Sequence, residues 1–386
     1  MPSERVRPRH AFALPWRLFS LLGLLDCTGI ISSQDAGTDA ATENAPTIAA
    51  TDGDEGIDPL VVTSELQGAV AAVQKAAART WTWVEVPGSR CGNGSVAGFA
   101  VNKEPNSSRL LIMYEGGGAC WDGISCYVVK SAFNIDTTID AAFFANNQQK
   151  TADSVLLPTA RNNADNPFRE ANLAFIPYCT GDLHNGNNII TYPLVAHPTY
   201  HVGSINSLLF TQVLAGALPA IEHVAVSGYS AGGFGAVLNF EETQRTFPRA
   251  RVDVIADSSE SLAGVLEHAS WRSAVPASIP GLNENNFSTL LPAYAQANPN
   301  SRFAALSFET DNVLPTFSFV TPDAFRAQVA QEFAAIRAHK NGNTFLLPGT
   351  NHVVLIHPEA KIGDIGLGAW LSMMVNDDPA WASLPP

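Results

Sequence analysis

Short apolar runs alternate with segments of helical spacing along the chain from residue 109 onward. Apolar runs of about four to eight residues are typical of strands buried on both faces of a parallel sheet, and apolar positions three and four residues apart are typical of covering helices. This pattern predicts strands at residues 109–114, 173–177, 223–226, 252–256, 302–308 and 344–347, and helices at residues 202–214, 234–240, 322–340 and 363–375. We therefore expect an α/β fold with a mainly parallel central sheet and helices on both faces.

The remaining segments have less regular patterns. The alanine-rich residues 64–79 predict a helix, and residues 81–86 and 98–101 read as strands. Residues 121–170 have weak periodicity and many Asn and Asp residues, so we expect an insertion of loops and short helices there. Residues 258–300 form a long connection rich in Ser, Asn and Pro, which is a place for a lid or a specificity element.

Residues 1–27 have the pattern of an export signal. Arg5, Arg7 and Arg9 form a basic start, and residues 18–25 form an apolar run that is too short to span a bilayer. Two interpretations of Cys27 stay open: an incidental cysteine in an ordinary cleaved signal, or the lipid-anchor site of a lipoprotein signal. Both predict a secreted or cell-envelope protein (extracellular, periplasmic or lipid-anchored) without a transmembrane span.

The composition changes sharply after this signal. Residues 28–58 contain seven acidic residues, no Lys or Arg, and few large apolar side chains, so we expect an acidic disordered linker. Residues 59–386 are then expected to form one catalytic domain. The formal net charge of the whole chain is −14, which excludes binding to nucleic acid by release of counterions.

Four cysteines remain after Cys27: Cys91, Cys120, Cys126 and Cys179. An even number of cysteines in an exported chain predicts disulfides, here two. Their spacing does not resemble a zinc site, and no C-x-x-C redox motif occurs. We therefore expect neither a metal nor a cofactor.

Residues 222–240 have the pattern of a buried strand, a turn of small residues and a helix. The turn GYSAG at residues 228–232 fits the nucleophile-elbow motif G-x-S-x-G. Glycines on both sides of such a serine give the sharp turn the space that it needs. The motif predicts that Ser230 is a catalytic nucleophile above the amino end of the following helix, which favours a developing oxyanion.

A nucleophilic serine needs a histidine base. Four histidines follow Ser230 in the chain: His268, His339, His352 and His357. His352 comes directly after the last predicted strand, at the end of the sheet where ligand chemistry gathers, and it is the favoured base. His357 is the second candidate, and a turn histidine bonded to nearby backbone is the structural alternative for His352.

The base needs an acid to orient it, and this acid is expected after the strand that precedes the last one. Asp311 follows the predicted strand at residues 302–308 and is favoured. Glu309 and Asp257 are the rivals, and Asp257 has the alternative role of bracing loops near the site. A helix N-cap or a turn residue is the structural alternative for Asp311.

Glycines follow the strand at residues 109–114 in the segment EGGG. Glycines allow backbone N–H groups to come close to a carbonyl oxygen. We expect Gly117 and Gly118, together with Ala231 after the nucleophile, to form the oxyanion hole.

Five segments together resemble the pectin acetylesterase/Notum family of serine carboxylesterases: YEGGGACWDGISC, PYCTGDLHNG, SGYSAGGFGAVLN, ADSSES and GTNH. The resemblance extends over about residues 80 to 375. It implies an α/β-hydrolase fold, a catalytic triad of Ser230, Asp311 and His352, and the oxyanion hole named above. It also implies disulfides between Cys91 and Cys179 and between Cys120 and Cys126.

The resemblance implies a secreted serine carboxylesterase that removes acetyl or other short acyl groups from an acylated carbohydrate such as pectin. The alternatives are ester bonds of lipids, lipidated proteins or polyesters, and a catalytically inactive carbohydrate-binding relative. Asp182 and His184 lie in a family-like loop, either as substrate contacts or as a turn carboxylate and a solvent-exposed histidine. Gly118-Ala119 and Tyr229 depart from the family's usual residues beside the acyl pocket, so the natural substrate stays open. The oligomeric state is open as well.

Overall fold

The computed structural model describes residues 64–260, 271 and 287–385, all within the unit Ile57–Pro386. The predicted export signal at 1–27 with Cys27, and the predicted linker at 28–58, lie outside the described residues. So do His268 and most of the first half of the connection at 258–300.

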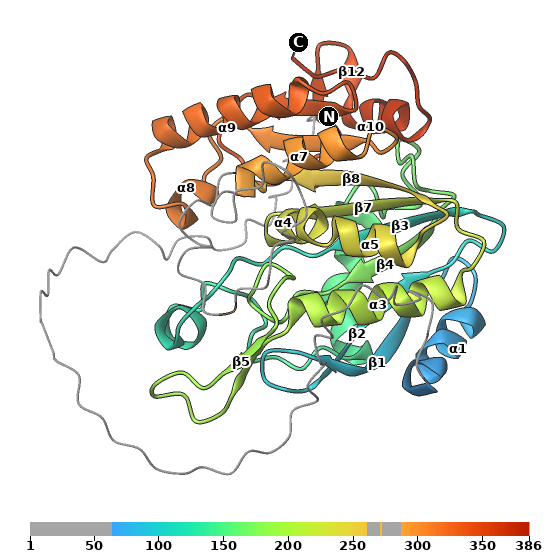
Figure 1. Cartoon of the computed structure of the whole chain (residues 1–386), viewed down its shortest axis with the longest axis vertical. Coiled ribbons are helices and arrows are strands. Elements are labelled where there is room, and N and C mark those ends of the chain that lie inside the picture. The colour runs from blue at the N-terminus through green and yellow to red at the C-terminus, as the bar shows by residue number, and fades with distance from the viewer. Residues whose placement is uncertain (1–63, 261–270, 272–286, 386) are drawn as a thin grey trace, which may run out of the picture. The chain divides into compact units, whose positions relative to one another are not determined.

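An eight-stranded sheet forms the centre of the described part, with the strand order β1-β2-β4-β3-β7-β8-β9-β10 (Figure 1). Its strands are β1 (Thr82–Arg90), β2 (Val96–Asn102), β3 (Arg109–Tyr114), β4 (Asn172–Ile176), β7 (His223–Tyr229), β8 (Arg251–Asp257), β9 (Phe303–Phe308) and β10 (Gly342–Leu347). The pairs β1–β2 and β2–β4 are antiparallel, and the other neighbours are parallel. The prediction of an α/β-hydrolase-like fold with a mainly parallel sheet is confirmed.

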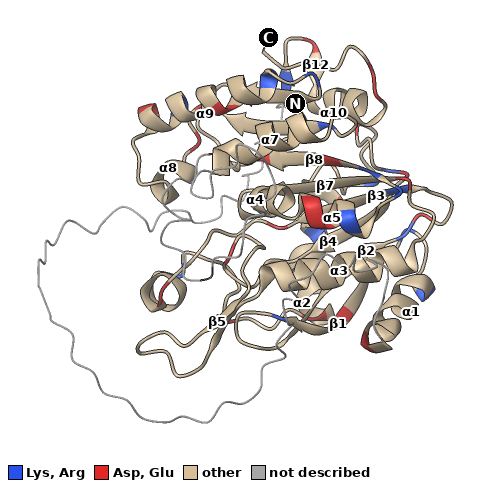
Figure 2. Cartoon of the chain, viewed as in Figure 1, with Lys and Arg blue, Asp and Glu red and all other residues tan. Residues whose placement is uncertain are grey.

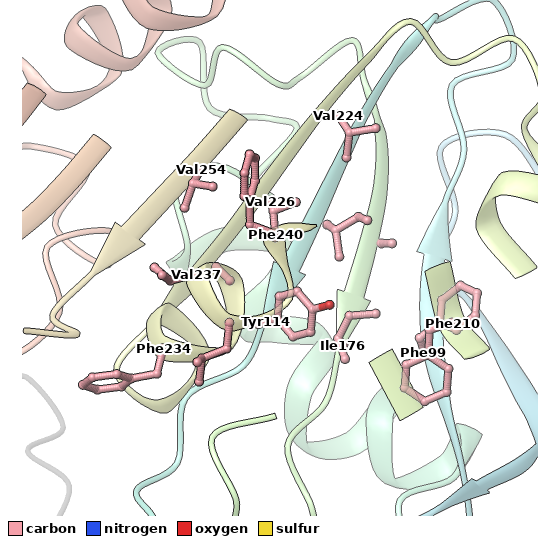
Figure 3. Close-up of a cluster of buried hydrophobic side chains, with 14 of the residues drawn as sticks. Phe99, Tyr114, Ile176, Phe210, Val224, Val226, Phe234, Val237, Phe240 and Val254 are labelled. Carbon is pink, nitrogen blue, oxygen red and sulfur yellow. The ribbon is translucent and has the colours of Figure 1, made fainter. Parts of the chain in front are cut away.

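Helices cover this sheet on both faces. They are α1 (Gln67–Lys75), α3 (Gly203–Ala217), α4 (Ala231–Leu238), α5 (Phe240–Thr246), α7 (Leu290–Ala297), α8 (Leu314–Phe317), α9 (Pro322–Arg337) and α10 (Leu367–Val375). The side chains of β3 alternate between two cores: Leu110 and Ile112 face one, and Leu111 and Met113 face the other. Figure 3 shows the first core, where side chains of β3, β7 and β8 meet those of α3, α4 and α5. The second core packs against α10, with Trp370 fully buried.

Short elements make up the predicted insertion. They are η2 (Ile124–Val128), α2 (Ala141–Phe143), η3 (Phe144–Gln148) and η4 (Thr151–Val155), with η1 (Ser64–Leu66) and η5 (Phe287–Thr289) elsewhere. Two small hairpins were not predicted, namely β5 (Asn188–Ile190) with β6 (Thr199–His201) and β11 (Lys361–Ile362) with β12 (Ile365–Gly366). The second hairpin occupies the start of the helix predicted at 363–375, because Gly363 turns the chain at φ 59°.

The helix predicted at 234–240 is two helices. α4 begins earlier, at Ala231, and α5 follows after Asn239. The side-chain amide of Asn239 donates to the carbonyl of His184 at 3.0 Å and to that of Gly235 at 2.9 Å. This hydrogen bond to a distant loop interrupts the helix at a point where the local sequence pattern predicts that it continues.

Both implied disulfides are present, Cys91–Cys179 and Cys120–Cys126. No helix within the described ranges is long and apolar enough to span a membrane. Lys and Arg residues lie scattered among Asp and Glu over the described elements (Figure 2).

Candidate active site

Ser230 stands at a sharp turn between β7 and α4. Its backbone has φ 53° and ψ −126°, which a residue with a side chain rarely adopts. A Cβ atom on Gly228 would lie 2.0 Å from the carbonyl oxygen of Gly232, and one on Gly232 would lie 2.1 Å from that of Tyr114. At both positions an added side chain would clash with backbone, so glycine is required for space and not only for its conformational freedom.

Hydrogen bonds hold the Ser230 backbone in this strained geometry. Its N–H donates to the carbonyl oxygen of Asp257 at 2.8 Å, and its carbonyl accepts from the N–H of Gly233 at 2.8 Å. Helix α4 begins at the next residue, Ala231, so its first N–H groups have no acceptor within the helix. The half-buried Ser230 side chain thus lies at the amino end of α4, beside the positive end of a helix dipole.

His352 and Asp311 are hydrogen bonded. Nδ1 of His352 lies 2.6 Å from Oδ2 of Asp311, and the Asp311 side chain is fully buried. Because a carboxylate only accepts, Nδ1 carries the hydrogen, and Nε2 of the neutral ring is an acceptor. That Nε2 atom is buried and has no hydrogen-bond partner in the described part of the chain, so a bond to Ser230 is not formed in this structure.

Ser230, Asp311 and His352 each follow a strand of the parallel sheet, namely β7, β9 and β10. Because these strands run in the same direction, all three residues lie at the carboxyl edge of the sheet. Open α/β sheets bind ligands at this edge. The nucleophile, acid and base predicted from the sequence therefore lie at one edge of the sheet. For Glu309, the rival acid, the structure shows a different contact: its backbone N–H donates to the carbonyl of Leu347 at 2.9 Å.

The loop after β3 approaches this edge through its glycines. Gly117 has φ 155° and Gly118 has φ 76°. A Cβ atom on Gly118 would lie 2.0 Å from the carbonyl oxygen of Ser131, and one on Gly117 would lie 2.7 Å from the ring of Tyr178. The N–H of Phe133 bonds the Gly117 carbonyl at 2.8 Å, which fixes the loop. Only glycine fits either position.

A buried polar group anchors the start of the same loop. Oε2 of Glu115 accepts from Gln148 Nε2 at 2.6 Å and from the N–H of Tyr178 at 2.9 Å. Burial raises the pKa of Glu115 to about 8, against the opposing effect of these two hydrogen bonds. The carbonyl of Glu115 lies 2.8 Å from Nε2 of His184, and because a carbonyl only accepts, this nitrogen carries the hydrogen.

Aromatic side chains border the glycine loop. A Cβ atom on Gly118 would lie 3.3 Å from Cζ of Phe317, at the end of α8. Phe133 is 61% exposed and Phe319 is 68% exposed, and the Phe319 ring stands edge-on to Trp121 with centroids 6.4 Å apart. Exposed rings of this size next to a catalytic loop are suited to contact a ligand.

Comparison with known proteins adds to this geometry. A family model described as Pectinacetylesterase matches residues 71–262. The Palmitoleoyl-protein carboxylesterase NOTUM of Drosophila melanogaster is 30% identical over 161 residues, covering 39% of this chain and 22% of that protein. The mouse protein of the same name is 25% identical over 177 residues, 44% of this chain and 33% of the relative. Palmitoleoyl-protein carboxylesterase notum1 of Xenopus laevis is 29% identical over 176 residues, 45% of this chain and 31% of the relative.

The chain belongs to the pectin acetylesterase/Notum family. It spans about a third or less of the length of these curated relatives. The pectinacetylesterase match includes Gly117, Gly118, Ser230 and Ala231 but ends before Asp311 and His352. The roles of those last two residues depend on their geometry alone.

Asp182 and His184, the two residues of the family-like loop, are both buried. The Asp182 carboxylate is fully buried and accepts from the N–H groups of Gly203 at 2.7 Å and Gly186 at 3.1 Å. It is therefore a turn carboxylate, one of the two alternatives expected. His184 is only 3% exposed, so the alternative of a solvent-exposed histidine is wrong. Burial lowers the pKa of His184 to about 4 and keeps the ring neutral.

Sequence reasoning missed the polar partners behind the site. Gln148 and Tyr178, which bind Glu115, lie far from it in the chain and carry no local signal. The sequence does offer a hint at Glu115, a charged residue directly after a buried apolar strand. In the described residues the one group of potential metal ligands is Cys120, Cys126 and His201, and its two cysteines form a disulfide.

Proposed function

We propose that this chain is a serine carboxylesterase that hydrolyses acetyl or other short acyl esters through an acyl-enzyme. The observation that carries the proposal is the His352–Asp311 hydrogen bond. It leaves Nε2 of His352 buried, with no hydrogen-bond partner among the described residues, at the sheet edge that also bears Ser230 on its elbow. Family membership supports the same chemistry, because the curated relatives are named as carboxylesterases.

In this mechanism the Ser230 hydroxyl oxygen attacks the ester carbonyl carbon while Nε2 of His352 accepts its proton. Asp311 stabilises the imidazolium that forms. The N–H groups of Gly117, Gly118 and Ala231 bind the oxyanion. The tetrahedral intermediate collapses, the C–O bond to the alcohol breaks, and His352 returns the proton to the leaving alkoxide. Water then hydrolyses the acyl-enzyme by the same steps, which regenerates the serine.

The Ser230–His352 hydrogen bond has to form before attack. Hydrogen bonds of this kind are often long or open in unliganded enzymes and tighten when substrate binds.

An acylated carbohydrate such as pectin is the first candidate substrate, in keeping with the family model's description. A longer acyl group on a lipid or protein is the second candidate, because exposed Phe133 and Phe319 border the glycine loop and the relatives are named for palmitoleoyl-protein. The reaction itself requires neither a metal nor a cofactor. Two disulfides support an exported protein that folds in an oxidising compartment.

Replacement of the nucleophile tests the proposal. Ser230→Ala is expected to lower kcat on p-nitrophenyl acetate by about 10⁴-fold or more and to abolish labelling by a fluorophosphonate probe. Ser227→Ala is the matched control. The Ser227 hydroxyl is buried in β7, the strand that ends just before Ser230, and it has no hydrogen-bond partner among the described residues. Full activity in Ser230→Ala would refute the proposal, and a wild-type protein that the probe does not label would favour an inactive binding protein.

A series of p-nitrophenyl esters separates the two substrate candidates. A kcat/KM that is highest for the two-carbon acyl group supports a deacetylase. A maximum at eight carbons or more removes that assignment and supports the longer-acyl candidate.

A further inference from the structure

The loop that carries His352 is clamped by two side chains at the end of β8, although β9 lies between β8 and the strand that precedes this loop, β10. The N–H groups of three consecutive residues after His352 are all bound there. Val353 donates to Oγ of Ser258 at 3.0 Å, Val354 to Oδ1 of Asp257 at 2.9 Å, and Leu355 to Oδ2 of Asp257 at 2.7 Å. Both carboxylate oxygens of Asp257 are thus occupied by the histidine loop.

This clamp holds strained backbone. Val353 has φ 69°, and Ser258 has φ 50°. A positive φ is unusual for any residue with a side chain and is a clear outlier for a β-branched valine. Such geometry persists only where surrounding contacts determine it, and here the three hydrogen bonds do so.

The same aspartate also holds the nucleophile. Its backbone carbonyl accepts the N–H of Ser230 at 2.8 Å. That carbonyl approaches α4 so closely that a Cβ atom on Gly233 would lie 2.7 Å from it. Asp257 therefore contacts both the elbow through its main chain and the histidine loop through its side chain.

We propose that Asp257 is a positioning residue that sets the distance between the Ser230 hydroxyl and the His352 imidazole, an inference that rests on the proposed esterase function. It does not serve as the acid of the triad, because Nδ1 of His352 is bound to Asp311. Small displacements matter here, since an error of about 1 Å in the placement of reacting groups can cost about 100-fold in rate.

Asp257 is replaceable without a large packing change. Burial raises its pKa to about 6, while hydrogen bonds from Leu355, Val354 and Ser258 and the nearby His352 act in the opposite direction. Asparagine has the size of aspartate and keeps one acceptor oxygen. Its NH₂ group would face the second loop N–H group, and it cannot accept a hydrogen bond from that donor. Asp257→Asn is therefore expected to fold and to release one end of the clamp.

The test compares two buried aspartates of β8. Asp257→Asn is expected to lower kcat on p-nitrophenyl acetate by about 100-fold, to change KM little, and to slow fluorophosphonate labelling in parallel. Asp253→Asn is the control, because Asp253 is equally buried and binds Arg251 and His223 away from the site. It is expected to lower the melting temperature and to leave kcat unchanged.

Four outcomes decide the matter. Wild-type kcat in Asp257→Asn, with Ser230→Ala inactive, overturns the positioning role and leaves the esterase proposal standing. Equal kcat losses in Asp257→Asn and Asp253→Asn show a general structural effect and also overturn it. Full activity in Ser230→Ala removes the esterase proposal itself. Should Asp257→Asn not fold, Ser258→Ala decides: a loss in kcat at constant KM supports the role, and wild-type kcat refutes it.

Discussion

The carboxylate of Asp311 binds two parts of the structure at once, namely the side chain of His352 and the backbone at the start of α8. Its Oδ2 atom lies 2.6 Å from Nδ1 of His352, while its Oδ1 atom accepts the N–H groups of Val313 at 2.7 Å and Leu314 at 3.0 Å. The second set of bonds occupies the N–H groups of Val313, the N-cap residue of α8, and of Leu314, its first residue. The Asp311 side chain therefore positions both the His352 ring and α8, the helix that carries Phe317 to the glycine loop.

Asp311→Asn separates these two tasks. Asparagine keeps an acceptor oxygen for the N–H groups of Val313 and Leu314, so the free energy of unfolding is expected to change by no more than about 1 kcal/mol. It cannot hold the histidine in the tautomer that accepts the serine proton, so kcat is expected to fall by about 10⁴-fold. Steady-state kinetics on p-nitrophenyl acetate and urea unfolding measure the two effects.

Glu309→Gln is the control for this change, because Glu309 is the rival acid on the same loop and is half-buried. It is expected to keep kcat within about threefold of the wild type, because Nδ1 of His352 is bound to Asp311 and not to Glu309. A large kcat loss in Glu309→Gln with an active Asp311→Asn would assign the acid to Glu309 instead.

Gly118→Ala tests the oxyanion loop. The added Cβ atom would lie 2.0 Å from the backbone carbonyl of Ser131 at a φ of 76°, so the loop has to move. Displacement of an oxyanion donor is expected to lower kcat by about 100-fold or more. Gly363→Ala is the matched control, because Gly363 has φ 59° and nothing within 4 Å of the added atom. It is expected to cost about 1 kcal/mol of stability for the positive φ alone and no activity.

Much of the fold follows from local patterns. β3 has the same bounds as the predicted strand at 109–114, because a run that is apolar on both faces leaves little choice of structure. The hairpin of β5 and β6 was missed because its strands are three residues long and partly exposed. The break at Asn239 was missed because its partner, the carbonyl of His184, lies 55 residues away in the chain.

The sequence indicated the residue types and the order of the proposed site but not its supporting contacts. The elbow motif and the positions after β9 and β10 indicated Ser230, Asp311 and His352, because strand ends of a parallel sheet meet at one edge. His184 was open to a solvent-exposed interpretation because nothing local shows that Glu115 lies beside it. The Asp257 clamp likewise joins residues that are 97 and 98 positions apart.

Glu115 is expected to make stability fall as the solution becomes alkaline. Its pKa is raised from 4.5 to about 8, so the native state keeps a proton that the unfolded chain has lost between these values. The free energy of unfolding therefore decreases as pH rises from 4.5 to about 8, and the decline levels off above that value. Between pH 7 and 9 Asp257, with a pKa of about 6, and His184, with a pKa of about 4, have finished titrating. Burial also raises the pKa of Glu260 well above its usual value, so a variant of Glu115 is needed to assign the change to that residue.

Glu115→Gln removes this titration and is expected to flatten the decline in melting temperature between pH 7 and 9. Glu85→Gln, on an exposed position of β1, is the control and is expected to follow the wild-type slope. An unchanged slope in Glu115→Gln would mean that Glu115 is already ionised at neutral pH in the native protein.

The two disulfides are expected to differ in what their removal costs. Cys91–Cys179 spans 88 residues, and Cys120–Cys126 spans six. Loss of loop-closure entropy predicts a cost of about 5 kcal/mol for the long loop and about 2 kcal/mol for the short one, measured by urea unfolding of the paired alanine variants. The order reverses for activity, because Cys120 lies two residues after Gly118 of the glycine loop and its carbonyl accepts from Trp271 Nε1 at 2.7 Å. The folded Cys120→Ala/Cys126→Ala variant is expected to lose kcat while the folded Cys91→Ala/Cys179→Ala variant keeps it, and equal unfolding free energies for the two variants would contradict the entropic account.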